Sequence, residues 1–144
     1  EMRARLVGSE MCIRDSTNSR SIAADDFFTG MFETALEEDE IIESISFSKP
    51  TKANYVKFPN PASRYAMVGV FVAKFGEGVR VAVTGAGEGG VFRHKEMETA
   101  LSSNYSSDSL SSLNIASDGL ISDLHASAEY RANLIKEMTK RAVV

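Results

Sequence analysis

An α+β fold is predicted for this chain of 144 residues: an antiparallel sheet of three to four strands packed against a group of helices. Two observations lead to this prediction. Short apolar segments bounded by glycine, proline and polar residues occupy the middle of the chain, and segments with apolar residues at helical spacing follow them. Strands that are followed by helices, rather than alternating with them, favour an antiparallel sheet with helices on one face.

Four segments have the composition of strands. The clearest is the continuous apolar run from Ala66 to Ala73, which is typical of a buried strand. Gly76-Glu77-Gly78 then supplies a tight turn, so this strand and the next should pair antiparallel as a hairpin. Pro50 is expected to mark the boundary between two structural units. The predicted strands are 41–47, 53–58, 66–75 and 79–84.

Helices are predicted near the start of the chain and after the strands. Residues 23–32 are expected to form one or two short helical turns that bury aromatic side chains, and 94–101 and 107–113 to form short helices. The last helix is the clearest, because Ser127 can cap it and apolar residues then recur on one face. The residues of this stripe are Tyr130, Leu134, Ile135, Met138 and Ala142.

The first residues do not fit this scheme. Residues 6–16 resemble the translation of a transposon-end adapter used in shotgun sequencing libraries, over a long and specific match. We therefore expect 1–20 to be an adapter-derived or disordered leader, and the natural reading frame, cut at its 5′ end, to start near Thr17. The chain is then expected to be the C-terminal piece of a longer protein, with 21–50 and 51–144 as its two parts.

Composition argues against several classes of function. The one cysteine, Cys12, lies inside the adapter-like segment, so the rest of the chain has no thiolate for a cluster, a zinc site, a disulfide or a nucleophile. With 16 basic and 20 acidic residues and no basic stripe, nucleic-acid binding is not expected. No apolar run approaches the roughly 20 residues that span a bilayer. We therefore expect no membrane span and a cytoplasmic protein.

The turn before the buried strand is the candidate functional segment. Pro61 limits its backbone, and Ser63, Arg64 and Tyr65 are presented just before the apolar run begins. An aromatic ring that is held in one place at low entropic cost, at the mouth of a core, can serve as a stacking surface for a flat ligand. The alternative is that Tyr65 is an ordinary aromatic at the edge of a strand.

A glycine-rich segment follows the strand predicted at 79–84. Residues 85–90, Gly-Ala-Gly-Glu-Gly-Gly, match the GxGxxG pattern of dinucleotide-binding proteins. That pattern binds pyrophosphate only if its last glycine opens a helix and a parallel strand follows. Here the chain continues through Val91-Phe92-Arg93, so we interpret the glycines as flexible turn residues, near a partner, and the helical signal as starting after Gly90.

Histidines and carboxylates offer no catalytic or metal site. His94 and His125 each lack a second ligand at metal-binding spacing. Asp118, Asp123 and Glu129 are expected to be solvated or to cap helices rather than to act as an acid and base pair. No catalytic residue and no metal ligand is therefore predicted.

Several ordered blocks resemble one family. Residues 58–70 are similar to the C-terminal domain of the flavoprotein, or medium, subunit of the molybdenum hydroxylases, the carbon monoxide dehydrogenase and xanthine dehydrogenase family. Residues 24–32 and 36–47 are similar to the closing part of the FAD-binding domain of the same subunits. The resemblance thus covers nearly the whole chain beyond the adapter-like segment. Its other blocks are 81–87, 91–93, 126–131 and 141–142.

The resemblance implies a place beside a flavin. In this family the N-terminal domain binds FAD through two glycine-rich loops, neither of which is present in this sequence, and the C-terminal domain closes over the isoalloxazine ring. A tyrosine just before the apolar strand lies near the flavin in the family, and Tyr65 matches it. Tyr65, Ser63 and Arg64 are therefore the expected cofactor-binding residues. Some members have an acidic residue where this chain has Arg64, so the detailed flavin contacts are expected to differ.

Tyr130 and Arg131 match the family's motif in the last helix. A structural role is expected for both, with Tyr130 packed on the sheet and Arg131 bonded to carbonyl groups or to an acid. Direct contact with the flavin is the alternative.

The parent protein that the resemblance implies is a subunit of an oxidoreductase. Electrons from a molybdopterin centre on a large subunit would pass through [2Fe-2S] clusters on a small subunit to the FAD of the medium subunit. Both subunits are expected partners, whereas the chain alone is expected to be inactive and to bind FAD weakly or not at all. The alternative is a free-standing α+β interaction domain without redox activity, because the chain contains no catalytic constellation.

Overall fold

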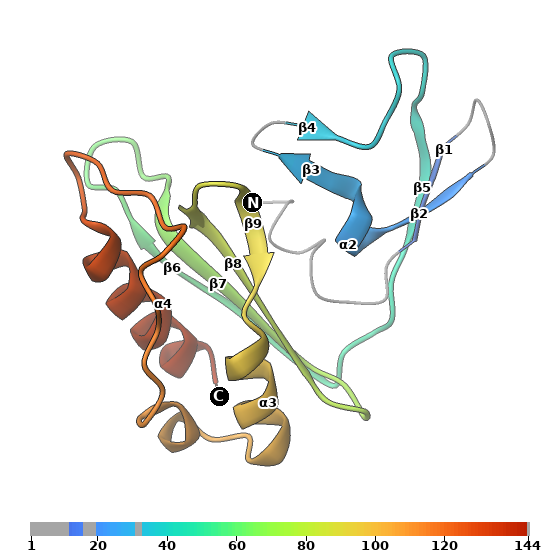
Figure 1. Cartoon of the computed structure of the whole chain (residues 1–144). Helices are drawn as coiled ribbons and strands as arrows, with labels where there is room; N and C mark the ends of the chain where they lie inside the picture. Colours follow the sequence, from blue (N-terminus) through green and yellow to red (C-terminus); the bar gives the residue numbers. More distant parts are fainter. Residues whose placement is uncertain (1–11, 16–19, 31–32, 144) are drawn as a thin grey trace.

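A four-stranded antiparallel sheet forms the centre of the structure. This structure is a computed structural model that describes residues 12–15, 20–30 and 33–143 (Figure 1). The strand order in the sheet is β6-β7-β8-β9. With helices packed on this sheet, the predicted α+β class is confirmed. The strands are β6 Lys52–Pro59, β7 Ala66–Lys74, β8 Val79–Gly87 and β9 Gly90–Arg93.

Two helices lie on one side of this sheet, as Figure 1 shows: α3, Lys95–Ser103, and α4, Ala128–Ala142. A short 3-10 helix, η1, covers Ser107–Leu110 between them in the sequence. α4 contacts β6 and β7, and α3 contacts β8. As predicted, Ser127 caps α4, because its side chain accepts a hydrogen bond from the N–H of Tyr130 at 3.3 Å.

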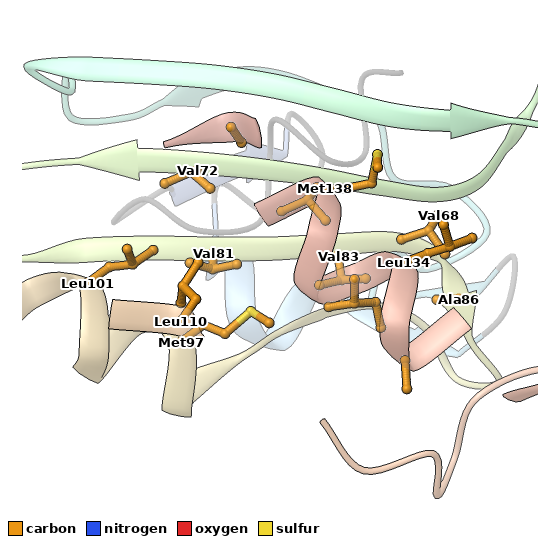
Figure 2. Close-up of a cluster of buried hydrophobic side chains, with 14 of the residues drawn as sticks. Val68, Val72, Val81, Val83, Ala86, Met97, Leu101, Leu110, Leu134 and Met138 are labelled. Atoms are coloured by element: carbon orange, nitrogen blue, oxygen red, sulfur yellow. The ribbon is translucent and has the colours of Figure 1, made fainter. Parts of the chain in front are cut away.

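The core lies between the sheet and these helices. The pairing of β7 with β8 sets Val70 opposite Val83 and Val72 opposite Val81, and all four side chains are fully buried. Alternation along both strands directs these valines to the helix side, where burial of each contributes about 1.5–3 kcal/mol. Figure 2 shows helical side chains that pack with this cluster: Met97, Leu101, Leu110, Leu134 and Met138.

The predicted hairpin of β7 and β8 is confirmed. Its turn is closed by a hydrogen bond from the N–H of Phe75 to the carbonyl of Gly78 at 2.7 Å. Side chains of α3 accept hydrogen bonds from two alternate N–H groups of β8. Val79 donates to Ser102 Oγ at 2.9 Å, and Val81 donates to Glu98 Oε1 at 3.0 Å. Helix and strand are thus joined by hydrogen bonds as well as by apolar packing.

Sequence analysis missed β9. Residues 91–93 were expected to be a loop before the helix at 94–101, but residues 90–93 are extended and pair with β8, with Arg93 opposite Ala82 and Phe92 opposite Val83. A segment this short has little conformational preference of its own, so the free edge of β8 decides its structure. α3 begins after this strand, at Lys95.

The residues before β6 form smaller elements, grouped apart from α3 and α4 in Figure 1. One three-stranded antiparallel sheet joins β1, Cys12–Asp15, to β2, Ser21–Ala23, and to β5, Ile42–Ser46. β5 confirms the strand predicted at 41–47. Of the predicted leader, 1–20, the structure describes only β1 and Arg20, and its origin stays a prediction.

The helical turns expected at 23–32 are shorter than predicted. α2 covers only Ala24–Phe27, because β3, Phe28–Gly30, is extended and pairs with β4, Glu33–Thr34. Burial of an aromatic here is confirmed for Phe27, which is 3% exposed and packs edge to face on Phe28 at 5.1 Å between ring centroids. The expected helical residues Met31 and Phe32 lie outside the described part. Among the helices that the structure does describe, none is long and apolar enough to cross a membrane.

Candidate functional site

The loop between β6 and β7 carries the three predicted cofactor-binding residues. The N–H of Asn60 donates to the carbonyl of Tyr65 at 2.7 Å, and the carbonyl of Asn60 accepts from the N–H of Arg64 at 2.9 Å. Its side-chain Oδ1 accepts from the N–H groups of Ala62 at 2.9 Å and Ser63 at 3.2 Å. The loop is therefore braced from within, and its exposed side chains start from fixed backbone positions.

Tyr65 is presented to solvent by this loop. It keeps 80% of its surface exposed, so its ring lies outside the hydrophobic core that begins with Met67 and Val68. Its backbone N–H is 3.4 Å from Ser63 Oγ. An ordinary aromatic at a strand edge buries much of its ring on neighbouring strands, and Tyr65 does not.

Arg64 adopts an unusual backbone conformation. Its φ of +63° lies in the left-handed region. Among the residues that the structure describes, Arg64 is the one residue other than glycine with a positive φ. For a residue with a Cβ this conformation costs about 1–2 kcal/mol. The backbone of Arg64, the residue before Tyr65, is therefore strained.

Asn60 was missed as a site residue. The stiffness of the loop was expected to come from Pro61, whereas four of its hydrogen bonds involve Asn60. Asparagine side chains bond to backbone N–H groups two residues further on, and an Asn-Pro pair marks turns for that reason. This signal was present in the sequence.

Arg131, in the first turn of α4, fastens this end of the sheet. Its Nη1 donates to the carbonyls of Met67 at 2.6 Å and Gly85 at 3.0 Å, and its Nη2 donates to Asp123 Oδ2 at 2.9 Å. Only 4% of Arg131 is exposed. The predicted bonding of Arg131 to carbonyl groups or an acid is confirmed, since it bonds to both.

Gly85 lies where the ladder between β7 and β8 ends. The last pair is Gly69 with Thr84, and β8 then bulges. Gly85 has a φ of +78°, and a Cβ on it would lie 2.3 Å from the carbonyl oxygen of Ala66. Only glycine fits this close approach of two backbones.

The interpretation of residues 85–90 as flexible turn glycines is wrong for part of the segment. Gly85 and Gly87 belong to β8, and only Glu88 and Gly89 form the turn into β9. Gly87 pairs with Gly90 of β9, whereas Gly85 lies in the irregular part of β8 with a φ of +78°. The segment leads into an antiparallel strand rather than a helix, so the geometry for binding pyrophosphate is missing.

A second braced turn lies beside Arg131. Asp123 Oδ1 accepts from the N–H groups of His125 at 2.9 Å and Ala126 at 3.0 Å, while its other oxygen binds Arg131. These hydrogen bonds, first those from the two backbone N–H groups and then that from Arg131, hold the pKa of Asp123 below its ordinary value. Leu124, at the tip of this turn, is 90% exposed. The predicted capping or solvated role of Asp123 becomes, in the structure, that of a turn brace.

Tyr130 packs less deeply than predicted. Its ring meets the ring of Phe58 on β6 edge to face, with centroids 6.3 Å apart, but 44% of the residue is exposed. Tyr130 therefore touches the sheet at its rim. The buried stripe of α4 starts instead with Arg131 and continues through Leu134.

A buried ion pair joins β9 to α3. Arg93 binds both carboxylate oxygens of Glu98, each at 2.8 Å, and reaches Asp25 at 3.1 Å. Burial alone would raise the pKa of Glu98, but hydrogen bonds from Arg93 and from the N–H of Val81 outweigh it and lower that pKa. This pair was missed because Arg93 and Glu98 belong to two different elements, so no helical or strand period relates them.

A cavity of about 550 Å³ lies away from the loop, between the turn before β9 and the segment 114–120. His94 lines it, and burial lowers the pKa of His94. Ser63, Arg64 and Tyr65 do not line this cavity. In the described ranges no group of three or more His, Cys, Asp or Glu side chains could hold a metal ion.

Comparisons with known proteins found a curated relative and a solved structure with a similar fold. The chain is 34% identical over 136 residues to the nicotine 6-hydroxylase medium subunit of Paenarthrobacter nicotinovorans, a match over 87% of this chain and 47% of that protein. The structure superposes on quinoline 2-oxidoreductase from Pseudomonas putida 86 with a TM-score of 0.77 and 21% identity, over 99% of this chain and 54% of that one. No protein-family model matches the sequence.

The chain thus spans about half the length of the proteins it matches. The first match is to a medium subunit, and the second supports the same fold. The first match favours the family reading over a free-standing interaction domain. The resemblance to the FAD-binding medium subunit of the molybdenum hydroxylases, inferred from the sequence blocks, is confirmed.

Proposed function

We propose that this chain is the C-terminal part of the FAD-carrying medium subunit of a molybdenum hydroxylase, in which the β6–β7 loop closes over the isoalloxazine ring. The similarity to a medium subunit supports the proposed subunit type. The geometry of the loop supports its proposed contact with the isoalloxazine ring. FAD binding is proposed for the intact subunit, and only weak or absent binding for the chain alone.

The observation that carries this proposal is the combination of exposure and rigidity at Tyr65. The residue is 80% exposed, yet its carbonyl is bonded within the loop and its neighbour Arg64 holds a strained conformation. Backbone strain persists where the surrounding structure imposes it, and such positions cluster at ligand sites. A flat aromatic surface in a fixed position suits a flat ring as its partner.

The residues present fit the ring of a flavin and not its pyrophosphate. An exposed tyrosine can stack on a flat ring, and Ser63 Oγ can help to orient the backbone of Tyr65. Arg64 would place a positive charge beside the ring, where charge tunes the redox potential. By contrast, the glycines at 85–90 lead into strand β9, so this segment does not open a helix whose N-terminus could bind a phosphate group.

The same proposal assigns the parts of the chain. Residues 1–20 are an adapter-derived leader, 21–50 the end of a truncated FAD-binding domain, and 51–144 the domain that closes on the flavin. The missing half of the subunit would then hold most of the FAD. The unmatched 53% or so of the medium-subunit relative leaves room for such a half.

The proposed parent enzyme distributes its chemistry over three subunits. FAD, when bound, supplies the acceptor for electrons that come from a molybdopterin centre on a large subunit through [2Fe-2S] clusters on a small subunit. The part of this chain is to cover the ring, to exclude water from it and to place charge beside it. A cytoplasmic location belongs to the same proposal.

The division of labour can be tested by FAD titration. The chain from Ser21 onward is expected to be purified without colour and to lose added FAD on gel filtration. The same chain joined to its upstream reading frame is expected to retain FAD. A yellow, stoichiometric complex formed by the short chain alone would contradict the proposal, as would an upstream frame that begins with a start codon next to Ser21.

A further inference from the structure

We propose that Arg131 is a positioning residue that fixes where Tyr65 meets the flavin, an inference that rests on the proposed function. Arg131 does not reach the ring of Tyr65. It acts on the backbone next to it, through the carbonyl of Met67, two residues beyond Tyr65. The carbonyl of the intervening Ala66 lies against Gly85, whose own carbonyl is also bonded to Arg131.

The first turn of α4 touches both legs of the loop. Tyr130 packs on Phe58 in β6, and the next residue, Arg131, bonds to Met67 in β7. The two strands are thereby held to one helix on either side of the loop 60–65. The base of the loop moves only if the start of α4 moves with it.

The chemistry of the bonds requires an arginine. A guanidinium group is planar and carries five donors in a fixed fork, whereas an ammonium group is a point charge on a flexible stem. Here the fork spans two carbonyls on two strands and one carboxylate, that of Asp123, on a loop. Lysine could satisfy one or two of these acceptors but could not hold all three in one plane.

Asp123 sets the guanidinium in place. It is the acid that offsets the charge of Arg131, whose exposed fraction is 4%, and it is itself braced by two backbone N–H groups. The backbone bonds use Oδ1 and the arginine bond uses Oδ2. An Asp123→Asn substitution can therefore keep the turn and replace only the oxygen that faces Arg131 by a donor.

Hydrogen exchange in the chain itself, without flavin, gives the first test. Arg131→Lys and Asp123→Asn are expected to speed amide exchange at 60–67 by about tenfold or more, while exchange in the core strands at 70–72 and 81–83 stays unchanged. Arg141→Lys on the exposed face of the same helix and Asp118→Asn in an exposed loop are the matched controls. Unchanged exchange at 60–67 in folded Asp123→Asn would overturn the proposal, even if Arg131→Lys failed to fold.

A double-mutant cycle on FAD affinity gives the second test, in the full-length medium subunit. Asp123→Asn is expected to weaken FAD binding about threefold to tenfold when Tyr65 is present, and to have no effect in a Tyr65→Ala background. Equal weakening in both backgrounds would show that Arg131 and Asp123 act independently of Tyr65, and would overturn the inference.

The two proposals fail in different ways. If Tyr65→Ala leaves FAD affinity unchanged, the proposed function fails, and the exchange experiment still decides whether Arg131 fixes the loop. If Tyr65→Ala weakens FAD binding but Asp123→Asn does not, the proposed function stands and the positioning role of Arg131 is wrong.

Discussion

The two ends of the β7–β8 pair solve different problems. At one end the chain simply reverses through Gly76-Glu77-Gly78, and α3 accepts the N–H groups of Val79 and Val81 with neutral and acidic side chains. At the other end the ladder stops at Gly69 and Thr84, and Arg131 of α4 donates to the carbonyls of Met67 on β7 and Gly85 on β8. We call these the turn end and the loop end.

Of the two ends, the loop end has the strained residue and the exposed apolar side chains. There a non-glycine residue has a positive φ, and Tyr65, Leu124 and Tyr130 are exposed on segments that hydrogen bonds hold in place. At the turn end, glycines provide the reversal and the apolar Phe75 is buried. A stable fold needs only what the turn end has: an unstrained reversal and buried apolar side chains. The loop end has features that stability alone does not explain, which is how ligand sites commonly look.

Alanine substitution of one glycine at each end gives the largest contrast. Gly85→Ala is expected to lower the free energy of unfolding by about 2–4 kcal/mol, because φ is +78° and the new Cβ would meet the carbonyl of Ala66. Gly76→Ala, whose Cβ would meet nothing within 4 Å, is expected to change it by less than about 0.5 kcal/mol. Urea unfolding measures both, and equal effects would remove the distinction between the ends.

The ion pair between Arg93 and Glu98, near the turn end, predicts that stability depends on pH. The pKa of Glu98 is lowered in the folded state, so its contribution is fully present above the ordinary pKa near 4.5 and is lost as the pH falls through the lower, folded value. Glu98→Gln is expected to cost about 1–3 kcal/mol at pH 7 and to flatten the loss of stability below pH 4.5. Glu96→Gln, on the exposed start of the same helix, is the control. A variant with an unchanged acid profile would contradict the role of Glu98.

Loss of the loop brace is expected to have a smaller effect. Asn60→Ala removes the acceptor for two N–H groups and should lower the free energy of unfolding by about 1 kcal/mol. Amide exchange at Ser63 and Tyr65 should rise more than exchange in β8. Asn114→Ala, at an exposed position of another loop, should change neither quantity. If loop exchange stays slow in Asn60→Ala, the brace lies elsewhere.

The smallest effect is expected at Arg64. Arg64→Gly relieves the strain of a φ of +63° but raises the conformational entropy of the unfolded chain. These two effects on the free energy of unfolding should cancel to within about 0.5 kcal/mol. Lys57→Gly in β6, where the backbone is extended, should cost about 0.5–1 kcal/mol. Similar losses for both variants, measured by thermal unfolding, would show that Arg64 carries no strain.

The sheet and the last helix were predictable because their signals are strong and local. The apolar run of β7, the glycine turn after it and the cap at Ser127 each determine one element with little help from the rest of the chain. β9 and the end of α2 were not predictable in the same way. Both depend on a partner strand, and single-sequence patterns do not contain pairing energies.

The candidate site was predictable in its exposed residues and less so in its supports. Tyr65 and Arg131 were singled out from the sequence, the former for its place before a buried strand and the latter from a family resemblance. Asn60 and Asp123 act through hydrogen bonds to backbone groups that only the folded loop brings within reach. Polar residues that hold a site in place through backbone hydrogen bonds can therefore be identified only from the structure.

The central claim is that the rigid loop end presents Tyr65 to a flavin. The most direct measurement is the dissociation constant of FAD for the full-length medium subunit with and without Tyr65→Ala. Loss of stacking should weaken binding by about 1–3 kcal/mol, that is, about fivefold to 150-fold, with an unchanged fold. An unchanged dissociation constant and unchanged flavin reduction kinetics in Tyr65→Ala would contradict the account.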